Sequence, residues 1–295
     1  MAKDDKAGKG KGKGKSAKRV KSTAAVVPVR ATDWPLAGWS MVACNVGQGD
    51  GLVLSTGPGH AVLVDVGPDP DGIDDCLDRL GVHTLDAVVL THFHADHVDG
   101  LPGALRGRVV SEVLTTPIGD PGYEVEAVRT WAASAGVPVS VVYAGDRFQW
   151  TDVQARAWWP ARVIRQGSIP KNASVVLTVS AGNLNLVLLG DIEREASRAV
   201  LGALRRDPEC VHWRVDVVKV AHHGSANRDD DLLDLLAAPV AVICVGVGND
   251  YGHPAPSTLS ALAARGFRVL RTDVDGDIAV GRPEGGQVLI ATHPP

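Results

Sequence analysis

The sequence predicts an α/β protein in which two β-sheets pack against each other and helices cover them. Short apolar runs rich in β-branched residues recur from Trp39 onward, and each run is too short to form a helix. Helical patterns lie between several of these runs in both halves of the sequence, which favours two packed sheets under helices. With 45% hydrophobic and 22% charged residues, the 295-residue chain can build one large layered domain.

The predicted strands are apolar runs that Gly, Pro or Asp residues interrupt. In the first half they are Met41–Val46, Gly51–Ser55, Ala61–Val66, Ala87–Leu90, Glu112–Thr115, Val137–Tyr143 and Gln154–Trp159. In the second half they are Val175–Ser180, Leu184–Leu189, Val215–Val220, Val240–Val245, Arg268–Arg271, Gly276–Val280 and Gln287–Ala291. The predicted helices are Ile73–Leu80, Tyr123–Ala135, Glu193–Arg206, Asp230–Leu236 and Ser257–Ala264.

No segment predicts a membrane span or an export signal. The longest uncharged run, Asn172–Gly190, contains several Ser, Asn and Gly residues, so it predicts two strands around the turn Ala181–Asn183. The apolar stretch Ala24–Val29 that follows the Lys-rich start is too broken for a signal peptide. The sequence alone therefore predicts a soluble, cytoplasmic protein.

The charge distribution divides the chain into a basic arm and an acidic body. Met1–Lys21 contains nine Lys or Arg and two Asp, a net charge of +7, and has no apolar period. The other 274 residues contain 21 basic and 32 acidic side chains, a net charge of −11. We expect residues 1–37 to be a disordered arm and linker and residues 38–295 to be the folded domain. The arm is either a solubilising tail or a weak binding site for phosphate polymers or anionic surfaces.

The four cysteines, Cys44, Cys76, Cys210 and Cys244, lie far apart in the sequence and form no Cys-x-x-Cys pair. This spacing argues against a disulfide framework and against a Cys-based zinc site. We therefore expect four ordinary thiols.

The strongest functional signal is the segment His92-Phe93-His94-Ala95-Asp96-His97, which directly follows an apolar run. Because alternate residues of an extended chain face the same side, His92 and His94 can present their imidazoles to one point. Asp96 and His97 follow where the chain turns, and they can approach a second, neighbouring point. Imidazole and carboxylate ligands together suit zinc, manganese or iron. The segment predicts a metal site.

Two later strand ends can complete this site. Asp191 follows the apolar run Leu186–Gly190, where it is either a helix N-cap or, given the histidine cluster, a bridging carboxylate. His222 and His223 follow another apolar run and precede Gly-Ser, which favours a place in the site over an ordinary buried histidine.

In these residues the sequence resembles the metallo-β-lactamase superfamily, and more narrowly the hydrolase domain of ComEC-type DNA-uptake proteins. The histidine cluster carries the resemblance to the superfamily. Three further motifs carry the narrower resemblance: Val46-Gly47-Gln48-Gly49-Asp50, His222-His223-Gly224-Ser225 and Tyr251-Gly252-His253-Pro254. Asn45 departs from the family pattern, which has Asp there, and the family's membrane channel region is missing from this sequence. The chain is therefore expected to be either an excised domain or a free-standing relative.

The resemblance implies a four-layer αβ/βα sandwich, the metallo-β-lactamase fold, with two divalent metal ions (Zn or Mn) at the sheet edges. By position, His92 and His94 would bind the first ion and Asp96 and His97 the second. Asp191 would bridge the two ions, and His222 would be the remaining ligand. The resemblance also implies DNA as the substrate, a membrane channel as a partner, and an extracytoplasmic location if the domain works as in ComEC-type proteins.

Other polar residues of these motifs have two interpretations each. Asp50 and Asp65 either form turns or hold metal-binding histidines in place. His253 is interpreted as a contact to the substrate phosphate or the leaving group, and His223 as a ligand or a phosphate contact. Together with Asp96, these two histidines are the predicted catalytic side chains. The remaining candidates either form turns or hydrogen-bond the site loops or the substrate: Asn172, Ser174 and Ser225.

The predicted metal site and the resemblance together imply metal-assisted hydrolysis. This chemistry requires no protein nucleophile, and no Ser or Cys lies in a recognisable nucleophile motif. Two cations about 3.5–4 Å apart would lower the pKa of a shared water towards about 7 and so give hydroxide at neutral pH. We expect a phosphodiesterase or nuclease that acts on DNA, although the acidic body argues against binding a polyanion. The alternatives are a hydrolase of a small phosphoester, lactone or thioester, and a non-catalytic module that binds nucleic acid or a partner. The native metal, the strand preference, the choice of endo- or exonuclease action and the oligomeric state stay open.

Overall fold

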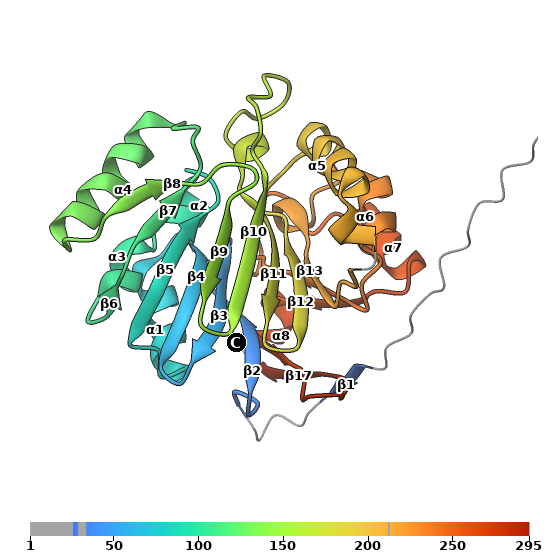
Figure 1. Cartoon of the computed structure of the whole chain (residues 1–295), viewed down its shortest axis with the longest axis horizontal. Coiled ribbons are helices and arrows are strands. Elements are labelled where there is room, and N and C mark those ends of the chain that lie inside the picture. Colours follow the sequence, from blue (N-terminus) through green and yellow to red (C-terminus); the bar gives the residue numbers. More distant parts are fainter. Residues whose placement is uncertain (1–25, 29–33, 212, 295) are drawn as a thin grey trace, which may run out of the picture.

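Two mixed β-sheets lie face to face at the centre of the protein, between two layers of helices (Figure 1). The structure is a computed structural model that describes residues 26–28, 34–211 and 213–294. Within these residues the first sheet has ten strands and the second has seven. The predicted disordered arm, Met1–Lys21, lies outside the described residues.

The first sheet collects strands from both ends of the chain. Its order is β1-β17-β16-β2-β3-β4-β5-β7-β8, and β6 also pairs with β5. The strands β4, β5, β7 and β8 run parallel, so their carboxyl ends lie at one edge. The bounds are β1 Val26–Pro28, β2 Trp39–Ala43, β3 Gly51–Gly57, β4 His60–Val66, β5 Thr84–Leu90, β6 Val109–Val110, β7 Val113–Thr115, β8 Val139–Val141, β16 Asp277–Gly281 and β17 Val288–His293.

The second sheet has the order β15-β14-β13-β12-β11-β10-β9. Its antiparallel part runs from β9 to β12, and β12 to β15 are parallel. The bounds are β9 Arg147–Trp150, β10 Val153–Trp159, β11 Val176–Ala181, β12 Leu184–Leu188, β13 Val217–Lys219, β14 Val240–Ile243 and β15 Arg268–Arg271.

The helices flank the two sheets on opposite sides (Figure 1). Those beside the first sheet are α1 Pro70–Arg79, α2 Ala95–Val98, α3 Leu101–Leu105 and α4 Gly122–Ser134. Those beside the second are α5 Arg194–Arg206, α6 Asp230–Leu236 and α7 Pro256–Ala264. The short α8, Thr272–Asp275, joins β15 to β16, and three 3₁₀ turns complete the set: η1 Lys171–Ala173, η2 Pro208–Val211 and η3 Ala221–Gly224.

Three hydrophobic layers hold these four structural layers together. The middle layer packs side chains of both sheets against each other, for example Val62 and Val64 with Leu177 and Leu186. The outer layers pack each sheet under its helices. Because both faces of both sheets are covered, most strand positions are apolar rather than alternating. The chain has the four-layer αβ/βα sandwich that the resemblance implied.

The elements predicted from the sequence are confirmed, with boundaries displaced by a few residues. The uncharged run forms the hairpin β11–β12, in which Ala181 pairs with Leu184 across the predicted turn. Among the described residues, no helix is long and apolar enough to cross a membrane. The unpredicted strand β1 pairs with β17 and lies inside the range 1–37, whose boundary at residue 37 stays a prediction.

The expectation of four ordinary thiols is wrong, because Cys44 and Cys76 form a disulfide. Cys44 directly follows β2 and Cys76 lies on α1, and both are fully buried under the first sheet. Their Cα atoms lie 6.0 Å apart, within the range that a disulfide spans, although 32 residues separate them in sequence. Cys210 and Cys244 are free.

Candidate metal centre

The candidate ligands lie where strands of both sheets end. His92, His94, Asp96 and His97 follow β5 and enter the short helix α2. Asp191 follows β12, and His222 and His223 follow β13 within η3. Because β12 and β13 are parallel neighbours, their carboxyl ends meet at one edge of the second sheet. The three distant stretches of chain converge there.

Four side chains form the centre of the site: Asp96, His97, Asp191 and His223. One ligand-type atom from each lies within 4.8 Å of the others. The His97 Nε2 atom is 3.4 Å from Asp191 Oδ1 and 3.7 Å from Asp96 Oδ2. The His223 Nε2 atom is 3.1 Å from Asp96 Oδ2 and 3.5 Å from Asp191 Oδ2. We call these four residues the four-donor cluster.

The four-donor cluster fits a divalent cation. Asp191 and His97 are buried, yet both carboxylate oxygens of Asp191 and the Nε2 atom of His97 have no hydrogen-bond partner among the described residues. Buried polar atoms are rarely left unpaired unless an ion or water satisfies them. Nitrogen and carboxylate donors are also the ligand set that zinc and similar metals accept.

Hydrogen bonds fix which nitrogen of each cluster histidine faces the centre. The His97 Nδ1–H group donates to Asp65 Oδ2 at 2.8 Å, and Asp65 also accepts from the backbone and hydroxyl of Thr91 at 2.7 and 2.8 Å. The His223 Nδ1–H group donates to the carbonyl of Cys244 at 2.9 Å. Such bonds hold metal-binding imidazoles in one tautomer and orientation. Asp65 therefore has the positioning contact that the sequence offered as one of two interpretations.

Asp50 lies behind the cluster and forms a buried ion pair with Lys219. Both side chains are almost completely inaccessible, at 1% and 0% exposure. The Asp50 carboxylate also lies 3.4 Å from His223 Nδ1 and 3.8 Å from His97 Nδ1, and the Lys219 ammonium donates to the Gly190 carbonyl at 3.1 Å. Asp50 and Lys219 thus support the cluster from the inside.

His92 and His94 lie beside the four-donor cluster rather than within it. The His92 ring is 4.1 Å from the His97 ring, and its Nε2 atom is 3.0 Å from His94 Nδ1. Its other nitrogen contacts the hydroxyls of Thr91 and Ser174 at 3.2 and 3.3 Å. Ser174 also accepts from the Asp191 backbone N–H, so it links the two stretches. Metal binding by His92 and His94 stays a prediction.

The two adjacent histidines of η3 point in different directions. Both have left-handed backbone angles, with φ of 50° for His222 and 51° for His223. His223 enters the four-donor cluster, whereas the His222 Nε2 atom contacts the Lys171 ammonium and its ring lies 5.0 Å from the His253 ring. Ligation by His222 therefore stays a prediction, and the geometry places His223 nearer to the other ligands.

The remaining candidates lie around this centre. His253 is tied to Asn249, whose amide donates to the His253 carbonyl at 2.7 Å. Asn172 is buried and bridges its own loop to Glu193 beside Asp191. Ser225 accepts from the backbone N–H of Asn227 at 3.2 Å, a turn contact outside the four-donor cluster.

The charged side chains of the site change one another's pKa values. Burial opposes the charged form of His97, but the carboxylates of Asp191 and Asp65 hold its pKa well above the ordinary value. Burial likewise opposes ionisation of Asp191, yet His223 and His97 hold its pKa well below the usual range. Burial lowers the pKa of His222 to about 4, so this imidazole is neutral at pH 7. Positive charge on His223 and His97 thus keeps the buried Asp191 carboxylate ionised. A divalent cation in the cluster would have the same effect.

Sequence reasoning missed two lysines of the site, Lys171 and Lys219. Lys219 interrupts the apolar run Val217–Val220, and a charged residue inside a buried strand is itself a signal of an internal partner. Lys171 precedes Asn172 in a loop, where no sequence pattern distinguishes it from a surface lysine.

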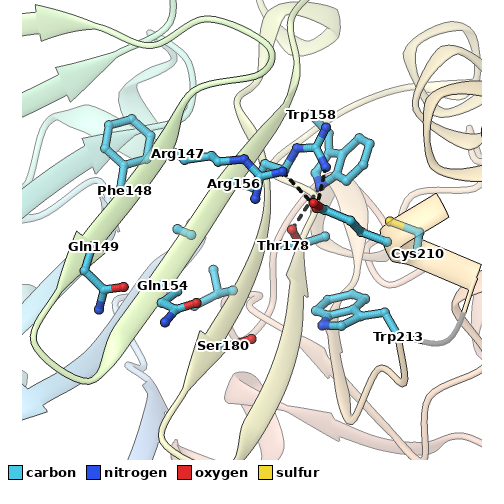
Figure 2. A pocket seen from close by; sticks show the side chains of 13 residues that line it. Arg147, Phe148, Gln149, Gln154, Arg156, Trp158, Thr178, Ser180, Cys210 and Trp213 are labelled. Atoms are coloured by element: carbon cyan, nitrogen blue, oxygen red, sulfur yellow. Dashed lines mark hydrogen bonds and ion pairs between the residues drawn. The ribbon is translucent and has the colours of Figure 1, made fainter. Parts of the chain in front are cut away.

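A separate cavity of about 330 Å³ lies on the outer face of β9, β10 and β11 (Figure 2). The Arg156 guanidinium lies 4.0 Å from the centre of the Trp158 ring and pairs with Asp207 and Glu209. Trp158 donates to the Thr178 hydroxyl at 2.9 Å. None of the candidate metal ligands lines this cavity.

The comparison with protein families decides the classification. The family model described as the metallo-beta-lactamase superfamily matches residues 45–247, which contain the whole four-donor cluster. The chain belongs to this superfamily. Among solved structures, the superfamily member is similar to the metallo-beta-lactamase fold protein YhfI from Bacillus subtilis, with a TM-score of 0.51 and 11% identity over 78% of this chain and 95% of that chain. This likeness confirms the fold alone.

Two curated relatives of this superfamily member are competence proteins. It is 30% identical to ComE operon protein 3 of Bacillus subtilis (strain 168) over 205 residues, 68% of this chain and 25% of that protein. It is 27% identical to competence protein ComA of Neisseria gonorrhoeae over 246 residues, 82% of this chain and 32% of that protein. These similarities support the ComEC-like resemblance. The chain spans about a quarter to a third of the length of these relatives.

Proposed function

We propose that this protein is a metal-dependent phosphodiesterase that hydrolyses DNA. The observation that carries the proposal is the buried four-donor cluster with its unpaired Asp191 and His97 atoms, in a chain similar to two competence proteins. The metallo-β-lactamase fold and the candidate ligands support a divalent metal-dependent hydrolase. DNA as the substrate and nuclease action are the finer part of the proposal.

Two metal positions, for Zn or Mn, belong to the same proposal. The four-donor cluster would hold one ion, and His92 with His94 would hold the other, sharing Asp191. When bound, such cations supply a hydroxide nucleophile at neutral pH and neutralise charge on phosphate oxygens.

The chain's own residues prepare the site for this chemistry. Asp65 and the Cys244 carbonyl hold the imidazoles of His97 and His223 so that both Nε2 atoms face the carboxylates. The pKa of His253 is lowered by burial and by the neighbouring His223, which favours a neutral imidazole at the rim. A neutral His253 can accept a proton as a general base, or donate an N–H hydrogen bond to a leaving oxygen, which is the leaving-group contact that the sequence predicted.

A cleavage assay tests the proposal. Purified full chain is incubated with single-stranded DNA and Mn²⁺ or Zn²⁺, and the control is the variant Asp96→Ala with His97→Ala. We expect cleavage that depends on added metal and is absent from the control. Equal cleavage by the two proteins, or none by either, overturns the nuclease proposal. Turnover of a small phosphoester, lactone or thioester with intact DNA would instead favour a small-molecule hydrolase.

Partner and location follow from the same resemblance. We propose that the domain acts beside a membrane channel and outside the cytoplasm, as the ComEC-like resemblance implies. Co-purification of the chain with a channel-forming polypeptide from its native cell tests the first part, and protease accessibility in intact spheroplasts tests the second.

A further inference from the structure

The loop between β10 and β11, residues 160–172, is basic in an otherwise acidic body. It contains Arg162, Arg165 and Lys171 and no Asp or Glu. In Figure 1 it rises above the ends of β10 and β11, between the two helical layers. We call this segment the basic loop. Its position above the strand ends places it at the same edge as the four-donor cluster.

Lys171 connects the basic loop to the metal centre. Its ammonium donates to the Nε2 atom of His222, whose neighbour His223 belongs to the four-donor cluster. No carboxylate pairs with Lys171 among residues 26–28, 34–211 and 213–294. A half-buried ammonium without an anionic partner is stabilised by an anion that arrives with the substrate. Lys171 is thus placed to contact a phosphate that is held at the metals.

Arg162 and Arg165 differ from most arginines of the protein. Many of the other guanidinium groups pair with carboxylates, as Arg79 does with Asp277 and Arg282 with Asp216. Arg162 and Arg165 are exposed and have no ion pair within the part of the chain that the structure describes. Exposed cations without internal partners are free to bind external anions, because no carboxylate must first be displaced.

Internal hydrogen bonds hold the basic loop in place. Trp159 donates from its indole to the Asn172 carbonyl at 2.6 Å, and the Asn172 amide donates to the Gln166 carbonyl at 3.0 Å. The Ser168 backbone N–H donates to the Glu193 carboxylate at 2.9 Å. Since Glu193 follows Asp191 by two residues, the loop is fastened directly to the metal-binding edge. These bonds hold the second half of the loop, which contains Lys171, in a defined position.

From these contacts we propose that the basic loop binds the phosphate backbone of a single nucleic-acid strand, an inference that rests on the proposed function. Lys171 contacts the phosphate at the site of cleavage, and Arg162 and Arg165 contact phosphates further along the strand. The loop supplies the local positive surface that a polyanion requires, although the body as a whole carries a net charge of −11.

The test compares the salt dependence of DNA binding by matched variants of the full chain. The loop variant is Arg162→Gln with Arg165→Gln. The control is Arg205→Gln with Arg206→Gln, which removes the same charge from the exposed last turn of α5. Binding of a fluorescein-labelled single-stranded oligonucleotide is followed by anisotropy in EDTA, from about 50 to 200 mM KCl. EDTA prevents cleavage, and the basic arm is the same in all proteins.

Each phosphate contact on a single strand contributes about 0.7 to the slope of log K against log salt. The loop variant removes two such contacts, so the magnitude of its slope should be smaller than that of wild type by about 1.4. At 0.1 M salt this corresponds to about 25-fold weaker binding. The control should keep the wild-type slope. Inorganic phosphate should inhibit DNA cleavage by the metal-loaded protein. Its inhibition constant should be higher for Lys171→Gln than for wild type, and Lys171→Arg should bring the constant part of the way back to the wild-type value.

The outcomes separate this inference from the proposed function. If the loop variant keeps the wild-type slope while wild type cleaves DNA, the basic loop is not the binding surface and the proposed function stands. If the control loses as much slope as the loop variant, the effect is general charge and the inference is overturned. If wild type binds through the loop but does not cleave, the proposed nuclease function fails and the binding surface stands.

Discussion

Replacement of Lys219 by methionine tests how the interior charge of the site is balanced. Lys219 is completely buried in β13, and its ammonium pairs with Asp50 and donates to the Gly190 carbonyl. Although burial opposes ionisation, the Lys219 charge keeps the pKa of Asp50 below its ordinary value. In Lys219→Met, the Asp50 carboxylate keeps only the imidazoles of His223 at 3.4 Å and His97 at 3.8 Å.

The magnitude follows from the burial of both partners. Removing one member of a buried ion pair costs about 3–5 kcal/mol, because the remaining charge is left uncompensated. For a domain of this size about 1 kcal/mol changes the melting temperature by roughly 2–4 °C, so we expect a decrease of about 6–20 °C. The double variant Asp50→Asn with Lys219→Met removes both charges, so it should lose less than the sum of the two single variants, with a coupling of about 1–3 kcal/mol.

Urea unfolding of the four proteins in EDTA at pH 7, followed by circular dichroism, measures these free energies. A loss below about 1 kcal/mol in Lys219→Met would refute the reasoning. Strict additivity in the double-mutant cycle would refute it as well, since the two charges would then not interact. Repeating the cycle with added metal shows whether a cation in the cluster takes over part of the compensation.

Three further predictions concern the metal, the disulfide and one carboxylate. Asp191→Asn should contain less bound metal than wild type by elemental analysis. It should also lack the stabilisation that metal gives wild type, which is about 2.7 kcal/mol when the metal concentration is a hundred times Kd. An unchanged metal content contradicts the site. The denatured, unreduced chain should titrate two thiols and the reduced chain four, and Cys44→Ala with Cys76→Ala should lose about 4 kcal/mol; four thiols before reduction would contradict the bond. Burial and the neighbouring Asp99 raise the pKa of Glu124 from an ordinary 4.5 to about 7. The native state therefore holds this proton more tightly, and wild type should lose on the order of 3 kcal/mol relative to Glu124→Gln as pH rises from about 4.5 to 7; a difference in unfolding free energy that does not change with pH excludes this.

The features that sequence reasoning predicted depend on local patterns. Strand and helix positions were predicted from apolar runs and from the Gly, Pro and Asp residues that interrupt them. The metal-binding segment after β5 was predicted from histidines and an aspartate that lie within a few residues of each other. Asp191 lies at a strand end because a parallel strand must deliver its carboxyl end to the sheet edge. These relationships are contained within a few consecutive residues.

The features that sequence reasoning missed depend on tertiary geometry. Two left-handed backbone angles turn the neighbouring side chains of His222 and His223 in different directions, and no local pattern predicts these angles; metal binding by His222 stays a prediction. Lys171 meets His222 across 51 residues of sequence, and Cys44 meets Cys76 across 32. No periodicity in the chain encodes these distances, so only the folded arrangement reveals the contacts.

The disulfide that links the end of β2 to α1 limits the conditions under which the domain can reach its final covalent form. Disulfides persist where glutathione does not keep thiols reduced, as in secreted and periplasmic proteins, and they are rare in the cytosol. Formation of this link therefore requires conditions in which cellular reductants do not keep the Cys44 and Cys76 thiols reduced. A sample prepared under strong reductant would be a different covalent species, and its activity would have to be compared with that of the oxidised form.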